Sequence, residues 1–168
     1  IILFVAHLSW LEPQITSLVP VLKSYWLTIH VSVITASYGF FGLSALLGFI
    51  TLVLYALLNA KKQNEQFFSI LTSIKEARRI NEMSMFIGLA LLVIGNFLGG
   101  IWANESWGRY WGWDPKETWT LVSILIYAII IHLHYIKKLN SNFIFSSLSM
   151  IAYSSIIMTY FGVNYYLT

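Results

Sequence analysis

The sequence predicts an all-α protein, a polytopic transmembrane helical bundle with an external tryptophan-rich loop. Hydrophobic residues make up 58% of the 168 residues and charged residues only 10%, whereas charged residues reach roughly 25% in a soluble domain. Several apolar runs have about the 20 residues that a helix needs to cross a bilayer. The charged residues gather in a few blocks between these runs. We therefore expect residues 1–168 to form a single membrane domain.

The charge and the cysteine count exclude several classes of function. The formal net charge is +3, too small an excess to indicate nucleic acid as a partner. Cysteine is absent, so the chain forms neither a disulfide nor a thiolate metal site, and it cannot link covalently to a ligand through sulfur. The chain begins with Ile1 inside an apolar run and has no basic leader. It is therefore expected to be part of a longer polypeptide rather than to carry a signal peptide.

The first third of the chain predicts one complete transmembrane helix. Residues 1–10 are too few to cross a bilayer and are expected to be a partial helix, and residues 11–25, with two prolines, read as a loop. Residues 26–58 form the longest apolar run. At about 1.5 Å per residue this helix exceeds the ~30 Å hydrocarbon core, so His30 in its first turns should lie at or above the membrane surface.

The rest of the chain alternates polar blocks with three more predicted spans. Residues 61–82 form the longest hydrophilic block and are expected to be a loop. In the next span, Asn96 and the Gly99, Gly100 pair interrupt the apolar run, and the small residues permit close helix packing. The last span carries many Ser and Tyr residues, which favours a helix facing other protein more than lipid. The predicted helices are 83–102, 115–136 and 143–167, and the external loop is 103–114.

Basic residues set the expected orientation, because short cytoplasmic loops are enriched in Lys and Arg. The loops at 61–82 and 137–142 hold seven basic residues, while the opposite side has only Lys23, Arg109 and Lys116. The tryptophan-rich loop and His30 are therefore expected on the outer side of the membrane.

A capping motif predicts where the third span begins. Asp114 as N-cap, Pro115 at the first helical position and Glu117 at the third resemble a capping box. A helix start also presents free N–H groups and a positive dipole end, which favour a bound anion. Arg109 and Lys116 would add positive charge there, although a solvated surface role fits their spacing equally well.

Five of the seven tryptophans lie between Trp102 and Trp119. An aromatic belt at the membrane surface is one explanation. A belt would distribute its rings over all helix ends, whereas Tyr110, Trp111 and Trp113 gather in one loop beside Trp107. This density favours a flat ligand, such as a planar macrocycle with acidic side chains whose faces stack on indole rings.

Histidines decide whether such a macrocycle contains iron. His30 is predicted on the same side as the tryptophans, where a neutral imidazole can ligate haem iron, although a single surface histidine more often has no special role. His132 lies roughly 25 Å deeper by helical rise from Pro115. His134 is about 200° around the helix from His132, so the two cannot address one site, and it fits an interfacial position. His7 cannot be placed.

The segment WGRYWGWDPKE resembles the signature WGxxWxWDxxE of the WWD haem-handling family of cytochrome c biogenesis, system II, which includes CcsA, also called ResC, and the fused CcsBA synthases. The matching residues are Trp107, Gly108, Trp111, Trp113, Asp114 and Glu117. The segment LVPVLKSYWLTIHV and the span after the motif resemble the family segments with an external and a transmembrane haem ligand. The resemblance assigns these roles to His30 and His132.

The resemblance implies a haem b substrate that is delivered for covalent attachment to the CxxCH motif of apocytochrome c. It implies a cytochrome c haem lyase whose partner is a CcsB/ResB-type protein or fused domain, in a bacterial inner membrane or a thylakoid membrane. Expected haem contacts are Trp107, Arg109, Tyr110, Trp111, Trp113 and Asp114, with His30 and His132 as iron ligands. The family's second external and second transmembrane histidines lie outside this chain, so we expect neither haem site to be complete within it and the fragment alone to be inactive. The alternatives are a haem chaperone or exporter without ligase activity, and a structural or quinone-binding subunit of a membrane complex.

Overall fold

The computed structural model describes residues 24–60, 65–136 and 140–166, and within these ranges it contains helices and no strand. The expected partial helix at 1–10, with His7, lies outside the described residues. The all-α prediction is confirmed. The helices are α3 (Tyr25–Ala60), α4 (Glu65–Trp107), α5 (Pro115–His132) with a 3-10 turn, η1 (Leu133–Tyr135), and α6 (Asn142–Ile157), which continues through a π-helical turn, η2 (Met158–Gly162), into α7 (Val163–Tyr166).

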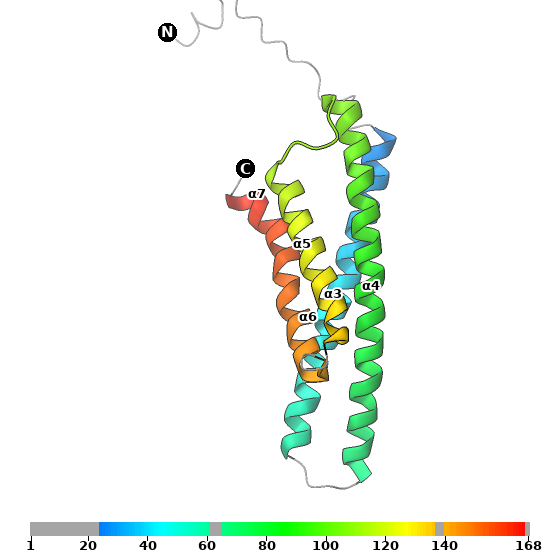
Figure 1. Ribbon diagram of the computed structural model, residues 1–168, viewed down its shortest axis with the longest axis vertical. Coiled ribbons are helices and arrows are strands. Elements are labelled where there is room, and N and C mark those ends of the chain that lie inside the picture. The colour runs from blue at the N-terminus through cyan, green and yellow to red at the C-terminus, as the bar shows by residue number, and fades with distance from the viewer. Residues whose placement is uncertain (1–23, 61–64, 137–139, 167–168) are drawn as a thin grey trace, which may run out of the picture.

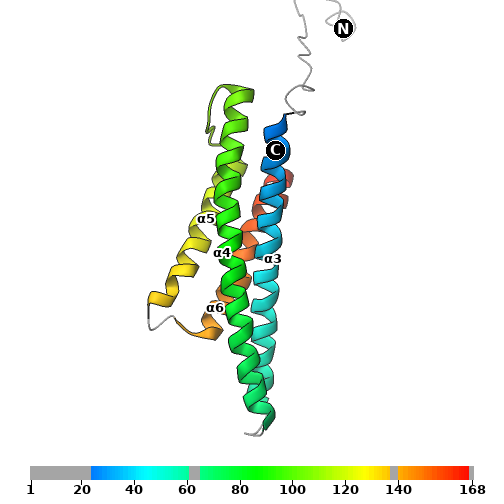
Figure 2. The ribbon, with the colours of Figure 1, turned by 90° about the vertical axis from the view of Figure 1, so that its right-hand side faces the viewer.

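Helices α3 and α4 form a long antiparallel hairpin, against which α5 and α6 pack (Figures 1 and 2). The hairpin extends beyond the end of η1 and the start of α6, so its Ala60 and Glu65 end stands apart from the four-helix part of the bundle (Figure 1). At the other end, α3 begins, α4 ends and the tryptophan-rich loop leads into α5. The candidate site lies at this second end.

Helix α4 is much longer than the span predicted at 83–102. It begins at Glu65, so most of the hydrophilic block expected as a loop is helical. This block has no Gly or Pro to interrupt a helix, and Ile74 within it is buried. The helix also continues to Trp107, where Gly108 ends it with a positive φ of 72° and an N–H that bonds to the Asn104 carbonyl. The loop between α4 and α5 is therefore shorter than predicted.

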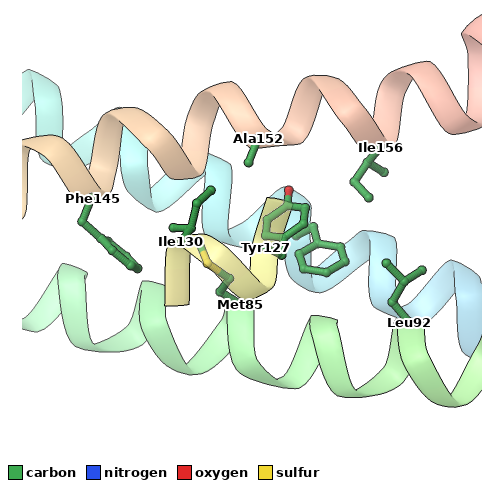
Figure 3. Packing of buried hydrophobic residues seen from close by; sticks show 8 residues of the cluster. Met85, Leu92, Tyr127, Ile130, Phe145, Ala152 and Ile156 are labelled. Carbon is green, nitrogen blue, oxygen red and sulfur yellow. The ribbon is translucent and has the colours of Figure 1, made fainter. Parts of the chain in front are cut away.

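The apolar core lies where the four long helices meet. Figure 3 shows this cluster, in which Tyr127 of α5 stacks on Phe41 of α3 with ring centroids 3.8 Å apart. Met85 and Leu92 of α4 and Ile156 of α6 complete its sides. Stacked aromatic rings of this kind contribute about 0.5–1.5 kcal/mol beyond the area they bury.

A hydrogen-bonded polar cluster joins three helices inside the bundle. Asn81 of α4 accepts a hydrogen bond from the Ser44 hydroxyl of α3 at 2.6 Å and donates to Ser149 of α6 at 3.1 Å. All three side chains are fully buried. A buried amide left without partners costs several kcal/mol in an apolar medium, so these bonds hold the three helices in one arrangement.

Arg78 ties α4 to the start of α6. Its guanidinium donates to Glu82 at 2.8 Å, to Asn142 at 2.8 Å and to Asn140 at 2.7 Å, and it lies over the Phe145 ring. Only 13% of the Arg78 side chain is exposed. Arg78 therefore fixes the chain segment that enters α6, at the end of the bundle away from the tryptophan-rich loop.

Three of the described helical segments are long and apolar enough to cross a membrane: Tyr25–Leu58, Phe67–Trp107 and Asn142–Tyr166. Phe86, Phe97 and Ile151 are exposed on these helices, as expected for surfaces that face lipid. Helix α5 has 18 residues, or about 27 Å by helical rise, and is not among the three. The predicted span at 115–136 therefore stays a prediction.

Candidate functional site at the tryptophan-rich end

A cavity of about 310 Å³ opens at the end of the bundle where α3 begins and α4 ends. Its lining comes from α3, α4, the loop after α4, α5, and the η2 to α7 part of the last helix. Five of the lining residues are Tyr or Trp rings from four different segments: Tyr38, Trp102, Tyr110, Trp111 and Tyr160. His30 lies among them, so the described chain brings one histidine and a set of flat rings into one space.

Helix α4 fixes the orientation of the His30 ring. The Nδ1 of His30 lies 2.8 Å from the carbonyl oxygen of Gly95. Because a carbonyl only accepts, Nδ1 carries the proton, and Nε2 of the neutral ring keeps its lone pair. A hydrogen bond of this kind to a backbone carbonyl is the usual way in which a protein orients a metal-binding imidazole.

Gly99 makes the close approach of the His30 ring possible. A Cβ at position 99 would lie 2.7 Å from Cε1 and 2.9 Å from Nδ1 of His30. The absence of a side chain therefore provides a flat helix surface on which the imidazole rests. The sequence suggested Gly99 only as a helix-packing residue.

The loop from Gly108 to Asp114 has an unusual backbone. Trp113 has a positive φ of 58°, a conformation that large side chains rarely adopt. It packs edge-to-face on Trp111, with ring centroids 5.6 Å apart. Of the two rings, Trp111 lines the cavity, and its buried Nε1 has no hydrogen-bond partner among the described residues.

Trp107 and Trp113 are 59% and 71% exposed and do not line the cavity, and Tyr110 is exposed but does line it. The three tryptophans of the motif thus have different positions. Trp111 lies in the cavity wall, while Trp107 and Trp113 present their rings outward at the same end of the bundle.

The capping box at the start of α5 is present as predicted. Asp114 Oδ1 accepts from the Glu117 N–H at 2.8 Å, and Glu117 Oε2 accepts from the Asp114 N–H at 3.4 Å. Glu117 Oε2 also accepts from the Gly112 N–H at 2.7 Å. One carboxylate therefore bonds the backbone on both sides of Trp113, which stabilises the positive φ at that residue. Both acidic residues also line the cavity.

The two cations near the loop differ in position. Lys116 lines the cavity. Arg109 is exposed, is not part of the lining, and its guanidinium lies against Gly112, where a Cβ would be 3.4 Å from Nε. Lys116 is the cation positioned to meet an anionic group of a ligand in this cavity.

His132 lies far from His30, at the other end of α5. It is exposed, and its Nδ1 donates to the Ala128 carbonyl at 2.7 Å, which again leaves the lone pair on Nε2. The structure does not bring the two histidines together. Among the described residues no group of three His, Asp or Glu side chains is arranged to hold a metal ion. The described residues would therefore supply one histidine ligand at the His30 position and one at the His132 position.

Sequence reasoning missed the part of the cavity wall that comes from the last helix. Thr159, Tyr160 and Asn164 line the cavity, together with Tyr38 and Thr35 of α3. The Ser and Tyr content of the last span indicated a helix that faces protein. It did not indicate which of its residues would reach the cavity.

Comparisons with a family model and with individual proteins point to the same family. The family model described as cytochrome C assembly protein matches residues 1–168. The chain is 59% identical over 167 residues to protein NrfI of Wolinella succinogenes, which covers 99% of this chain and 18% of NrfI. It is 36% identical to the cytochrome c biogenesis protein CcsA of Cyanophora paradoxa and 38% identical to that of Mesostigma viride, over 80% and 70% of this chain. The chain spans 55% and 45% of the length of these two relatives.

Proposed function

Because the chain belongs to the cytochrome c assembly protein family, we propose that it handles haem b and delivers it for covalent attachment to apocytochrome c. The chain takes part in cytochrome c maturation, and the attachment of haem is the finer step that we propose. The observation that carries this proposal is the position of His30, which is held by the Gly95 carbonyl and lines a cavity with Trp111, Tyr110 and Trp102.

The residues of the cavity fit haem as a substrate. His30 offers an axial nitrogen, and the aromatic rings offer flat apolar surface. The Lys116 ammonium offers a donor for carboxylates such as propionates. Haem supplies the vinyl groups to which the two thiols of a CxxCH motif add. Since this chain has no cysteine, both thiols belong to the apocytochrome.

The contribution of this chain to the reaction is positioning. The Gly95 carbonyl and the Gly99 surface hold the His30 ring at one angle, and Glu117 holds the loop that carries Trp111. A substrate held at a fixed position and angle reacts with a partner as in an intramolecular step. Trp107 and Trp113, exposed at the same end, are the proposed surface that the apocytochrome meets.

The proposal places the cavity on the outer side of a bacterial inner membrane, or of a thylakoid membrane, because Lys75, Arg78 and Arg79 of α4 lie toward the other end of the bundle and short cytoplasmic segments are rich in basic residues. His132 is proposed as a ligand of an inner haem site, with its partner ligand on a CcsB/ResB-type protein or domain. The exposed position of His132 supports this, since an ionisable side chain within a span is costly unless other protein covers it.

Substitution of His30 tests the proposal. In the purified full-length protein, His30→Ala is expected to lower the bound haem and the yield of holocytochrome, and added imidazole should restore part of both. Ser32→Ala, an exposed change in the same helix turn, is the matched control. Normal haem content and yield in His30→Ala would refute the proposal. Covalent haem on an apocytochrome that is coexpressed with no other maturation factor distinguishes a synthase from a chaperone, and a haem-free protein would support a structural or quinone-binding subunit.

A further inference from the structure

The last helix changes its winding at the level of the cavity. From Met158 to Gly162 it forms a π-helical turn, closed by a hydrogen bond from the Val163 N–H to the Met158 carbonyl. The three residues that this helix contributes to the cavity are Thr159, Tyr160 and Asn164. Thr159 and Tyr160 lie in the π turn itself, and Asn164 is the second residue after it. Single π turns within α-helices occur frequently at functional sites.

Two local features maintain the π turn. Asn164 Nδ2 donates to the Tyr160 carbonyl at 2.7 Å, which supports the backbone inside the turn. A Cβ at Gly162 would clash with the Met158 side chain, so glycine lets the turn close over that methionine. Thr159 in the turn and Val163 directly after it are both buried against the bundle.

The wide turn directs Tyr160 toward α3. The Tyr160 ring packs edge-to-face on Tyr38, with centroids 6.3 Å apart and an interplanar angle of 80°. Tyr38 follows His30 by eight residues on the same face of α3, with Ile34 between them, and all three line the cavity. The two tyrosines therefore form an aromatic wall about 12 Å deeper along α3 than His30 by helical rise.

An ordinary aromatic belt does not account for this pair. Tyr165 and Tyr166 are 84% and 79% exposed at the end of the chain and do not line the cavity. Phe161, next to Tyr160 in the π turn, is also exposed and outside the lining. Tyr160 is itself 55% exposed, but it alone of these four rings lines the cavity, and it packs on Tyr38 of α3.

We propose that Tyr160, directed by the π turn and packed on Tyr38, is a positioning residue that contacts the porphyrin of haem in the cavity. This inference rests on the proposed function and adds a second wall to it, beside the one made by Trp111 and His30. The ring is the required part of Tyr160, since packing against a macrocycle needs a flat surface and not the hydroxyl.

Haem titration of full-length variants tests the inference. Tyr160→Ala is expected to weaken haem binding about 5- to 10-fold, as loss of one aromatic contact does, and Tyr160→Phe should bind as the unchanged protein does. Tyr165→Ala, which removes an exposed ring of the same helical segment outside the cavity lining, is the matched control and should also bind normally. Thermal unfolding of the three variants without haem should agree within a few degrees.

The possible outcomes separate the two proposals. Equal haem affinity in Tyr160→Ala and Tyr165→Ala, with weak binding in His30→Ala, would overturn the role of Tyr160 and leave the proposed function intact. Normal haem binding in His30→Ala and in Tyr160→Ala would overturn both. A loss in Tyr160→Phe as large as in Tyr160→Ala would overturn the ring contact as the cause.

Discussion

Replacing Gly99 by alanine tests whether the α4 surface positions His30. A Cβ there would lie 2.7 Å from Cε1 of His30, whereas ordinary contact begins at 3.4 Å, so the ring must move by about 0.7 Å. A shift of this size away from α4 lengthens the 2.8 Å hydrogen bond from Nδ1 to the Gly95 carbonyl beyond the favourable range. Loss of one such bond is worth about 1 kcal/mol, or roughly a fivefold change in an equilibrium constant.

The expected result for Gly99→Ala is haem affinity about fivefold lower with little change in stability. Alanine is about 1 kcal/mol more favourable than glycine inside a helix, which offsets the lost hydrogen bond in the free energy of unfolding. Haem titration followed by Soret absorbance measures the first quantity, and thermal unfolding in detergent measures the second.

Gly39→Ala is the matched control for Gly99→Ala, because a Cβ at position 39 meets nothing within 4 Å. It gives the same gain in helix propensity without a contact at the site. If Gly99→Ala and Gly39→Ala bind haem equally well, the α4 surface does not position the ring and the reasoning fails.

Two further predictions concern the residues that hold the bundle and the loop. Arg78→Ala should destabilise the protein by about 2–3 kcal/mol, because it removes three hydrogen bonds of a mostly buried charge; thermal unfolding measures this, and a loss no larger than in the exposed Arg79→Ala would contradict it. Glu117→Ala should lower haem affinity several-fold, because the Gly112 N–H loses its acceptor and the loop is no longer held. Glu117→Gln, which keeps an acceptor oxygen, should retain most of the affinity, and equal losses in both variants would contradict this role.

Local signals in the sequence predicted the local features of the structure. The start of α5 could be predicted because Asp114, Pro115 and Glu117 specify a helix start through interactions within one turn. The charges of the 61–82 block predict a loop, whereas α4 already begins at Glu65. Those residues are good helix formers, and Ile74 beside them is buried in the hairpin.

The contacts that shape the candidate site depend on packing between helices. No local pattern indicates that the Gly95 carbonyl meets His30, because the two are 65 positions apart in the sequence. The amino-acid composition also does not predict the positive φ of Trp113 or the π turn around Tyr160. Both are conformations that the surrounding contacts maintain against the ordinary preferences of the chain.

The buried amide of Asn81 also sets the register of the site. Fourteen residues separate His30 from Ser44 in α3, and fourteen separate Asn81 from Gly95 in the antiparallel α4. The Ser44 to Asn81 bond and the His30 to Gly95 bond therefore join the same two helices in one register. A shift of α4 along α3 that broke the Ser44 to Asn81 bond would also break the His30 to Gly95 bond. A polar group in the middle of the bundle thus determines the height at which the histidine is presented.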